Sequence, residues 1–173
     1  MEFFETLALR KSSRAYTAEK VSPADIDKLV FAANSAPVGG AHYDTIHLTV
    51  VQEPGVREAL RAACVPDGGN ADPFYGAPLV ILVSARARAS SPSVEYANAA
   101  CIVEHVHLAA TALGLGSVYI WGCLPALRAN AAFKATLKIP DGFEPISAVA
   151  VGHVEEAPAP RSFGGQYACD FFE

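Results

Sequence analysis

Residues 94–122, "VEYANAACIVEHVHLAATALGLGSVYIWG", predict a long helix followed directly by a strand. Ala99, Ile102, Val106 and other apolar residues recur at helical spacing, and Gly114 suits the position just beyond a helix end. Small and apolar side chains surround the predicted helix on several faces, so we expect it to be central and largely buried. The strand is predicted over "SVYIWG", residues 117–122.

Strands and helices alternate along the rest of the chain. Helices are predicted within 2–11, 21–37, 55–65 and 124–137, and strands at 45–51, 79–85 and 146–154. Ser22 is the expected N-cap of the helix that Pro37 ends. Because helices separate the strands, a mixed or parallel sheet flanked by helices is favoured. No repeat or linker divides residues 1–173, which suits one domain.

Composition excludes several classes of function. The 173 residues carry a net charge of −5, which argues against a broad nucleic-acid surface. No apolar run approaches the length of a membrane span. The opening "MEFFETLAL" has no basic region typical of a secretion leader, so we expect a cytoplasmic protein.

Cysteine and histidine spacing gives no metal site. Four cysteines form no C-x-x-C pair, and we expect reduced, mostly buried thiols. His105 and His107 are two residues apart, which points them in different directions on a helix. Gly114 and Gly116 do not extend to G-x-G-x-x-G, which disfavours a Rossmann dinucleotide site.

The strongest local cluster is "LRKSSRAYT", residues 9–17. Its three cations and two hydroxyls suit a phosphate monoester, because Arg offers a planar fork of donors and Ser a hydroxyl. The alternative is that basic residues gather at the end of a helix for reasons of its dipole alone. Both interpretations stay open on the cluster by itself.

Two glycine-containing segments are further candidates. The loop "APVGGAHYD", residues 36–44, allows a close backbone approach to a flat ligand, and "GLGSVYIWG", residues 114–122, can present a bare N–H. A plain connecting loop and an ordinary helix–strand junction are the alternatives. The side chains of His42, Tyr43, Phe74 and Tyr75 are candidates for a substrate pocket, although aromatic residues also form cores.

Segments at 9–37, 75–85, 97–122 and 139–161, in this order, resemble the nitroreductase family of flavin enzymes. The opening basic pair with Ser, the closing Ala-Pro, the "ALGLGSVYIWG" junction and the Pro-rich tail ending in Arg carry the resemblance. It implies an α+β fold with a mixed central sheet and one long central helix. It also implies FMN as cofactor and a homodimer with the flavin at the interface.

The family pattern assigns roles to residues of this chain by position. Arg10, Lys11, Ser12 and Arg14 would hold the phosphate and ribityl arm, and Arg161 would approach the phosphate. Trp121 and Gly122 would lie beside the flavin, with a backbone N–H facing N5. The partner subunit would supply the loop formed by Pro37, Val38, Gly39 and Ala41.

One departure from the family pattern concerns this loop. Ala41 stands where family members commonly have Asn, so the loop is expected to contact flavin through its backbone. The resemblance implies an FMN-dependent oxidoreductase that passes electrons from NAD(P)H through flavin N5 to a small aromatic or conjugated acceptor: a nitroaromatic, quinone or enone. Because of the altered loop, the alternative is a flavin-binding carrier or sensor of the same fold with little turnover.

Overall fold

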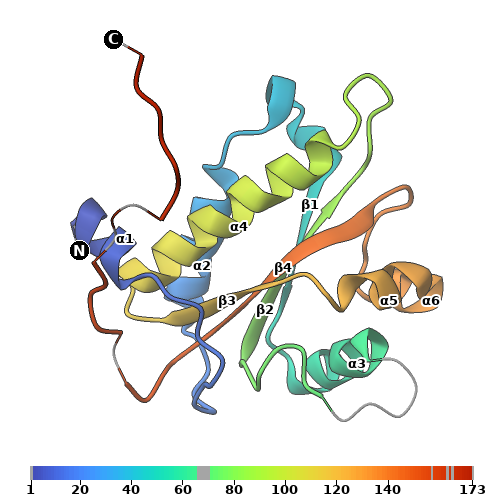
Figure 1. Cartoon of the computed structure of the whole chain (residues 1–173). Coiled ribbons are helices and arrows are strands. Elements are labelled where there is room, and N and C mark those ends of the chain that lie inside the picture. Colours follow the sequence, from blue (N-terminus) through green and yellow to red (C-terminus); the bar gives the residue numbers. More distant parts are fainter. Residues whose placement is uncertain (1, 66–70, 157, 163, 165, 173) are drawn as a thin grey trace.

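Helix α4 (Val94–Ala112) lies across one face of a sheet in the computed structural model of the chain (Figure 1). The structure describes residues 2–65, 71–156, 158–162, 164 and 166–172. The other helices are α1 (Phe3–Leu9), α2 (Pro23–Asn34), α3 (Pro54–Cys64), α5 (Leu124–Ala129), α6 (Ala131–Thr136) and the short 3-10 turns η1 (Gly39–Ala41) and η2 (Tyr43–Thr45). The strands are β1 (Ile46–Val51), β2 (Leu79–Ala85), β3 (Gly116–Ile120) and β4 (Glu144–Gly152).

The α+β architecture confirms the predicted class, but the direction of the strands differs from the expectation. The sheet has the order β1-β2-β4-β3, and each of its three pairings is antiparallel. Among the described residues, the parallel pairing is the isolated bridge between Ser12 and Ser117. The predicted parallel or mixed pairing of the main strands is therefore wrong.

The connections explain this difference. Helix α4 returns the chain across the sheet, so β2 and β3 run in the same direction, as a helical crossover predicts. However, β4 lies between them and is antiparallel to both. The connection from β3 to β4 contains two short helices, α5 and α6, which carry the chain out and back. Helix α3 and the segment before β2 likewise connect β1 to β2, so these two neighbouring strands run in opposite directions.

The sheet separates two apolar cores. All seven residues of β2 are buried, and because side chains alternate along a strand, Ile81 and Val83 pack toward α2 and α4. Val80 and Leu82 pack toward α3 and α5 on the other face. The layers are therefore helix, sheet and helix (Figure 1).

Local side chains set the helix ends. The Ser22 hydroxyl accepts a hydrogen bond from the Asp25 N–H at 3.1 Å, which confirms the predicted N-cap. The single helix predicted over 124–137 is wrong, because Asn130 interrupts it. The Asn130 side chain instead caps α6 by accepting from the Phe133 N–H at 3.0 Å.

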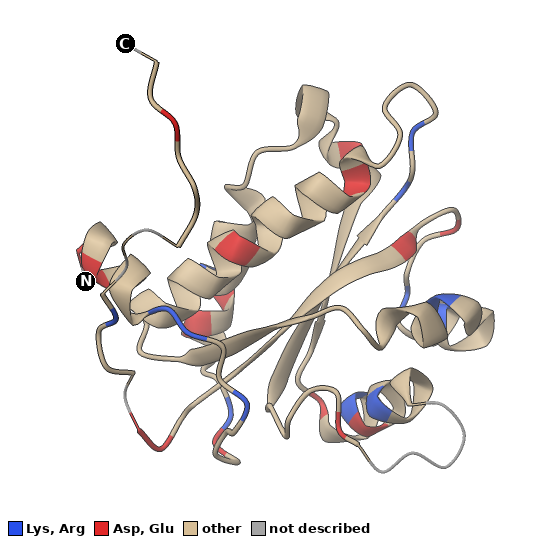
Figure 2. Cartoon of the chain, in the orientation of Figure 1, with Lys and Arg blue, Asp and Glu red and all other residues tan. Residues whose placement is uncertain are grey.

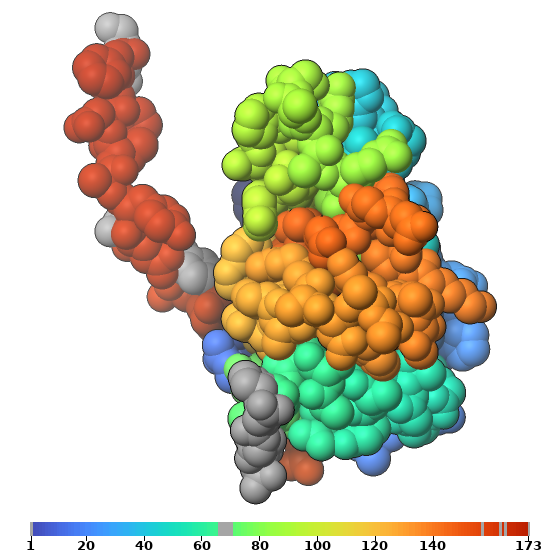
Figure 3. All heavy atoms as spheres, turned by 90° about the vertical axis from the view of Figure 1, so that its right-hand side faces the viewer, coloured from blue at the N-terminus to red at the C-terminus, as the bar shows by residue number. Residues whose placement is uncertain are grey.

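Described residues near the C-terminus extend away from the body of the domain (Figure 3). Tyr167, Phe171 and Phe172 are 83–98% exposed, so they leave large apolar surface without cover in the isolated chain. Within the described ranges, no helix has the length and apolar content needed to cross a membrane.

The four cysteines carry free thiols, but the expectation that they are mostly buried is only half right. Cys64 is buried and Cys123 is half-buried. Cys101 is exposed because it lies on the outward face of α4, and Cys169 is exposed because it lies in the extended tail.

Candidate functional site

The predicted basic cluster is fixed to the start of β3. The Ser13 N–H donates to the Ser117 carbonyl at 2.9 Å, and Ser12 forms the parallel bridge with Ser117. The Tyr16 hydroxyl donates to the Ser13 carbonyl at 2.7 Å and lies 3.3 Å from the Ala150 carbonyl. Burial raises the pKa of Tyr16, so this hydroxyl keeps its proton and its role as donor. The backbone of the segment therefore has a defined place, while the side chains of Lys11, Ser12 and Arg14 are exposed to solvent.

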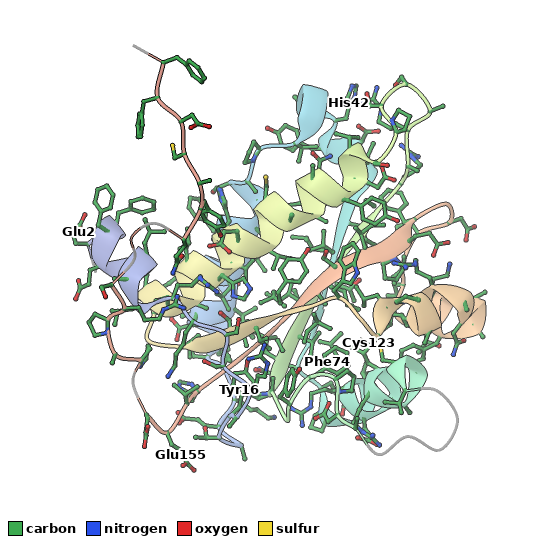
Figure 4. All side chains as sticks on the ribbon, in the orientation of Figure 1. Glu2, Tyr16, His42, Phe74, Cys123 and Glu155 are labelled. Atoms are coloured by element: carbon green, nitrogen blue, oxygen red, sulfur yellow. The ribbon has the colours of Figure 1, made fainter. Side chains whose placement is uncertain are left out.

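A hollow of about 410 Å³ opens beside this segment. One wall is the cationic segment, and the other comes from the chain after β4: the lining residues are Lys11, Ser12, Ser13, Arg14, Ala15, Tyr16, Val154, Glu155 and Glu156. Figure 4 shows Tyr16 and Glu155 at this end of the molecule, and Figure 2 shows the cations and acids around it. In the described part of the chain, neither Lys11 nor Arg14 forms a salt bridge.

Charges of both signs face this hollow, so its walls differ in what they can bind. Lys11 and Arg14 offer donors for an anion, whereas Glu155 and Glu156 on the opposite wall repel one. Arg14 also lies over the Tyr75 ring, 5.9 Å from its centre. An anion is therefore expected against the wall formed by residues 11–14.

The structure brings Arg161 to Arg10 from the other end of the chain. The Arg161 N–H donates to the Ala8 carbonyl at 3.0 Å, and its guanidinium donates to the Arg10 carbonyl. The Arg10 guanidinium lies 4.0 Å from a Glu104 carboxylate oxygen, at the outer limit of an ion pair. The two arginines predicted at one site thus meet where α1 ends.

An aromatic and polar row continues from the cations along β3. His107 Nδ1 and Ser117 Oγ are 2.7 Å apart, and the His107 ring stacks on Tyr119 at 6.4 Å. The Trp121 ring lies 6.5 Å from that of Tyr119 and 5.7 Å from that of Tyr96. With a rise of about 3.3 Å per residue, Trp121 lies about 13 Å from Ser117 along the strand.

Open space lies beside the end of this row. Trp121 is 48% exposed, and a Cβ placed on Gly122 would meet no atom within 4 Å. Among the described residues, the Gly122 N–H has no hydrogen-bond acceptor. The Gly122 backbone is therefore open on this side, and the predicted contact of its N–H with a ring edge stays a prediction.

The predicted loop after Pro37 lies away from the cationic segment. Figure 4 shows His42 far from Tyr16, at the end of the molecule where α4 begins. The Gly39 N–H donates to Asn98 Oδ1 at 2.9 Å, and a Cβ on Gly39 would lie 2.8 Å from the Val94 side chain. Val38, Gly39 and Ala41 therefore form a compact turn on α4, and one chain does not bring this turn to the cations.

The four candidates for the substrate pocket lie in different places. His42 and Tyr43 follow the turn at the start of α4, whereas Tyr75 lies with Arg14. Phe74 is 2% exposed and packs in the core beneath α3 and α5. Only Tyr75 therefore lines the surface near the cations.

Two further residues were not singled out from the sequence. Tyr96 packs on Trp121 from the first turn of α4, and no sequence pattern links these two positions. The sequence did contain a signal for His107: it is a polar residue among the buried, mostly apolar positions of a long helix, where a polar group needs a hydrogen-bond partner. Among the described residues, no group of three or more His, Cys, Asp or Glu is placed to hold a metal ion.

Comparisons with known proteins identify relatives. The model of the nitroreductase family matches residues 7–153. An Archaeoglobus fulgidus protein, provisionally named NADH dehydrogenase/NAD(P)H nitroreductase, is 26% identical over 155 residues, covering 90% of this chain and 87% of the relative. These matches confirm the resemblance predicted from the sequence.

Solved structures show the same fold. A Bacteroides fragilis NCTC 9343 nitroreductase with bound FMN has a TM-score of 0.82 and 25% identity, with 100% of both chains covered. A Desulfitobacterium hafniense DCB-2 nitroreductase with bound FMN has a TM-score of 0.84 and 20% identity, with 99% of this chain and 98% of the other covered.

The buried His107 predicts a pH dependence of stability. Burial, and then the charge of Arg10, lower the pKa of His107 to about 4, against about 6.5 in an unfolded chain. Between these values the unfolded state binds the extra proton, so stability falls as pH drops through this window and is constant above it. The loss is on the order of 3 kcal/mol for native protein.

The measurement is urea unfolding at several pH values and fixed protein concentration. His107→Gln keeps a polar group near Ser117 but cannot titrate. The variant should therefore lack the pH-dependent loss of about 3 kcal/mol that native protein shows in this window. Equal pH dependence in the two proteins would show that His107 is not held neutral.

Proposed function

This chain belongs to the nitroreductase family, and on that premise we propose that it is an FMN-dependent oxidoreductase that uses NAD(P)H. One observation carries the proposal: a cationic segment is tied to the start of β3, and open backbone lies at the end of the same strand. FMN has these two needs, since a phosphate and a planar ring stand at opposite ends of a ribityl chain. Two relatives of the same fold are solved with FMN bound.

The residues present fit the phosphate end. Lys11 and Arg14 face the hollow without salt bridges among the described residues, and the exposed Ser12 hydroxyl lies between them in sequence. Charge-assisted hydrogen bonds from such groups are the strong contacts that a phosphate receives. Arg10, held by Arg161 and near Glu104, adds positive charge where α1 ends.

The residues present also fit the ring end. Trp121 lies about 13 Å from Ser117 in the direction of β3. Next to it, Gly122 leaves open space, and its N–H has no acceptor among the described residues. When bound, FMN would supply hydride-transfer chemistry that no side chain offers. The chain's own part would be to orient the ring: the Gly122 N–H would donate to its edge, and the Trp121 side chain would exclude water beside it.

The aromatic surface favours a planar acceptor. Tyr96 and Trp121 are 39% and 48% exposed and pack on each other, so they offer flat apolar area at the ring end. Offset or edge contacts with another aromatic ring stabilise such a ligand by about 0.5–1.5 kcal/mol. We therefore propose nitroaromatics, quinones or enones as the acceptor class.

The position of the turn after Pro37 supports a homodimer. This turn and the cationic segment lie apart in one chain, so a site that uses both needs a second copy. The outward face of α4 carries small or apolar exposed residues, including Ala97, Ala100 and Cys101. Small side chains allow two helices to pack closely, so we propose this face as the dimer contact.

A flavin carrier with little turnover is the second candidate function. The turn after Pro37 offers few groups to a ligand, because Asn98 already accepts from the Gly39 N–H and Ala41 has no polar side chain. Weak contact with the ring on this side would favour storage of flavin over electron transfer.

Anaerobic titration of the FMN-loaded protein separates these two functions. Addition of NADH or NADPH is expected to bleach the visible flavin absorbance with about one equivalent, since a hydride carries two electrons. A quinone added afterwards should restore the colour. Tight flavin binding with no bleaching by either nucleotide would favour the carrier, and protein that takes up no FMN would contradict both.

The dimer is tested by Ala100→Arg on the outward face of α4. Burial of an unpaired guanidinium costs several kcal/mol, so the dimer dissociation constant should rise by about 100-fold or more, with weaker FMN binding. Sedimentation velocity and FMN titration measure the two effects.

The matched control is Ala59→Arg, which adds the same charge to an exposed position of α3 on the other side of the sheet. It should leave both mass and FMN affinity unchanged. A native monomer that binds FMN tightly would contradict the shared site.

A further inference from the structure

Two acids stand opposite the cationic segment. Glu155 and Glu156 follow β4, and they line the same hollow of about 410 Å³ as Lys11 and Arg14. Both acids are exposed, and no salt bridge among the described residues joins either of them to a cation. The hollow therefore has a cationic wall and an acidic wall that do not neutralise each other by direct contact.

Backbone contacts hold these two walls beside each other. The Thr17 N–H donates to the His153 carbonyl at 2.9 Å, which joins the end of the cationic segment to the chain that leaves β4. Gly116, at the start of β3, packs against Ser13 and Val154: a Cβ placed on it would lie 2.8 Å from Ser13 Oγ and closer still to the Val154 side chain. The backbone that carries the acids is therefore fixed next to the backbone that carries the cations.

A phosphate monoester and a diphosphate ester would use this hollow differently. A terminal phosphate carries a charge of about −1.5 to −2 at pH 7, and all of it can lie against the cationic wall. In a diphosphate ester such as FAD, the charge is divided between two phosphates, and the second continues away from the first. With the first phosphate against residues 11–14, the second lies nearer to the acidic wall, where like charges repel it.

We propose that Glu155 and Glu156 make this hollow selective for a terminal phosphate monoester, so that the chain binds FMN and rejects FAD. The inference rests on the proposed function, because it takes the hollow as the place of the flavin phosphate. It assigns a role in cofactor choice to two residues that bind no part of FMN themselves. They act by repelling the wrong ligand, which is one of the two ways in which a site gains specificity.

Space alone could also reject FAD, since FMN has no adenosine. Charge and space differ in how they respond to removal of the acids and to salt. Repulsion between exposed charges falls as the Debye length shortens from about 30 Å at 0.01 M salt to about 8 Å at 0.15 M, whereas steric exclusion does not. If charge selects the cofactor, neutral residues at 155 and 156 should therefore improve FAD binding most at low salt.

The test measures the binding of FMN and of FAD to the full chain freed of flavin, by equilibrium dialysis at low salt. Native protein should bind FMN at least about tenfold more tightly than FAD, since two nearby like charges each change an affinity by about threefold in water. Glu155→Gln with Glu156→Gln should raise the affinity for FAD by about tenfold and that for FMN by about twofold, because the FMN phosphate lies farther from the acids. At higher salt the gain for FAD should shrink.

Asp27→Asn with Asp141→Asn is the matched control, because it removes two exposed negative charges that do not line the hollow. It should leave the ratio of the two affinities unchanged. Glu155→Lys with Glu156→Lys extends the series and should raise the affinity for FAD beyond that of the Gln variant. An unchanged ratio in both Glu variants, with native protein still rejecting FAD, would show that space alone selects the cofactor and would overturn the inference.

The outcomes separate this inference from the proposed function. Native protein that binds FMN and FAD equally well, and whose flavin is bleached by NADH or NADPH, would overturn the selectivity alone. Protein that takes up neither flavin would contradict the FMN-dependent function and this inference together.

Discussion

The pairing of Ser12 and Ser13 with Ser117 is the contact on which the site depends. It places three cations of an acidic chain at the start of β3, and the fixed rise of a strand then sets their separation from Trp121. Without this pairing, residues 10–14 would be an ordinary charged segment after a helix. With it, one strand carries the proposed phosphate-binding end and the proposed ring-binding end.

The two faces of the sheet carry different groups of residues. The face of α4 carries His107, Tyr96 and the small residues proposed for the dimer contact, so cofactor, acceptor and partner would all meet there. The opposite face carries the second apolar core, which packs against α3 and α5. Because β3 ends at Ile120 and Cys123 precedes α5, a few residues connect these two regions.

Sequence patterns located most elements because local rules set them. The apolar run 79–85 is β2 residue for residue, and Ser22 caps α2 as predicted. The predicted strand direction was wrong, because the length of a connection does not show whether it brings the next strand back parallel or antiparallel. The contact of Tyr96 with Trp121 joins residues distant in sequence, so only tertiary packing determines it. The basic cluster could be recognised from the sequence, whereas the position of Glu155 and Glu156 on the opposite wall of the hollow could not.

The most direct measurement compares the affinities of FMN and riboflavin, which differ only in the phosphate. Native protein should bind FMN at least about 100-fold more tightly, since two charge-assisted contacts each contribute about 1.5–3 kcal/mol. Lys11→Gln with Arg14→Gln should remove most of this difference, because these two cations line the hollow. Arg57→Gln with Lys138→Gln, which deletes the same charge away from the hollow, should preserve it. Equal affinity of native protein for the two ligands, or an unchanged preference in the Lys11 and Arg14 variant, would contradict the account.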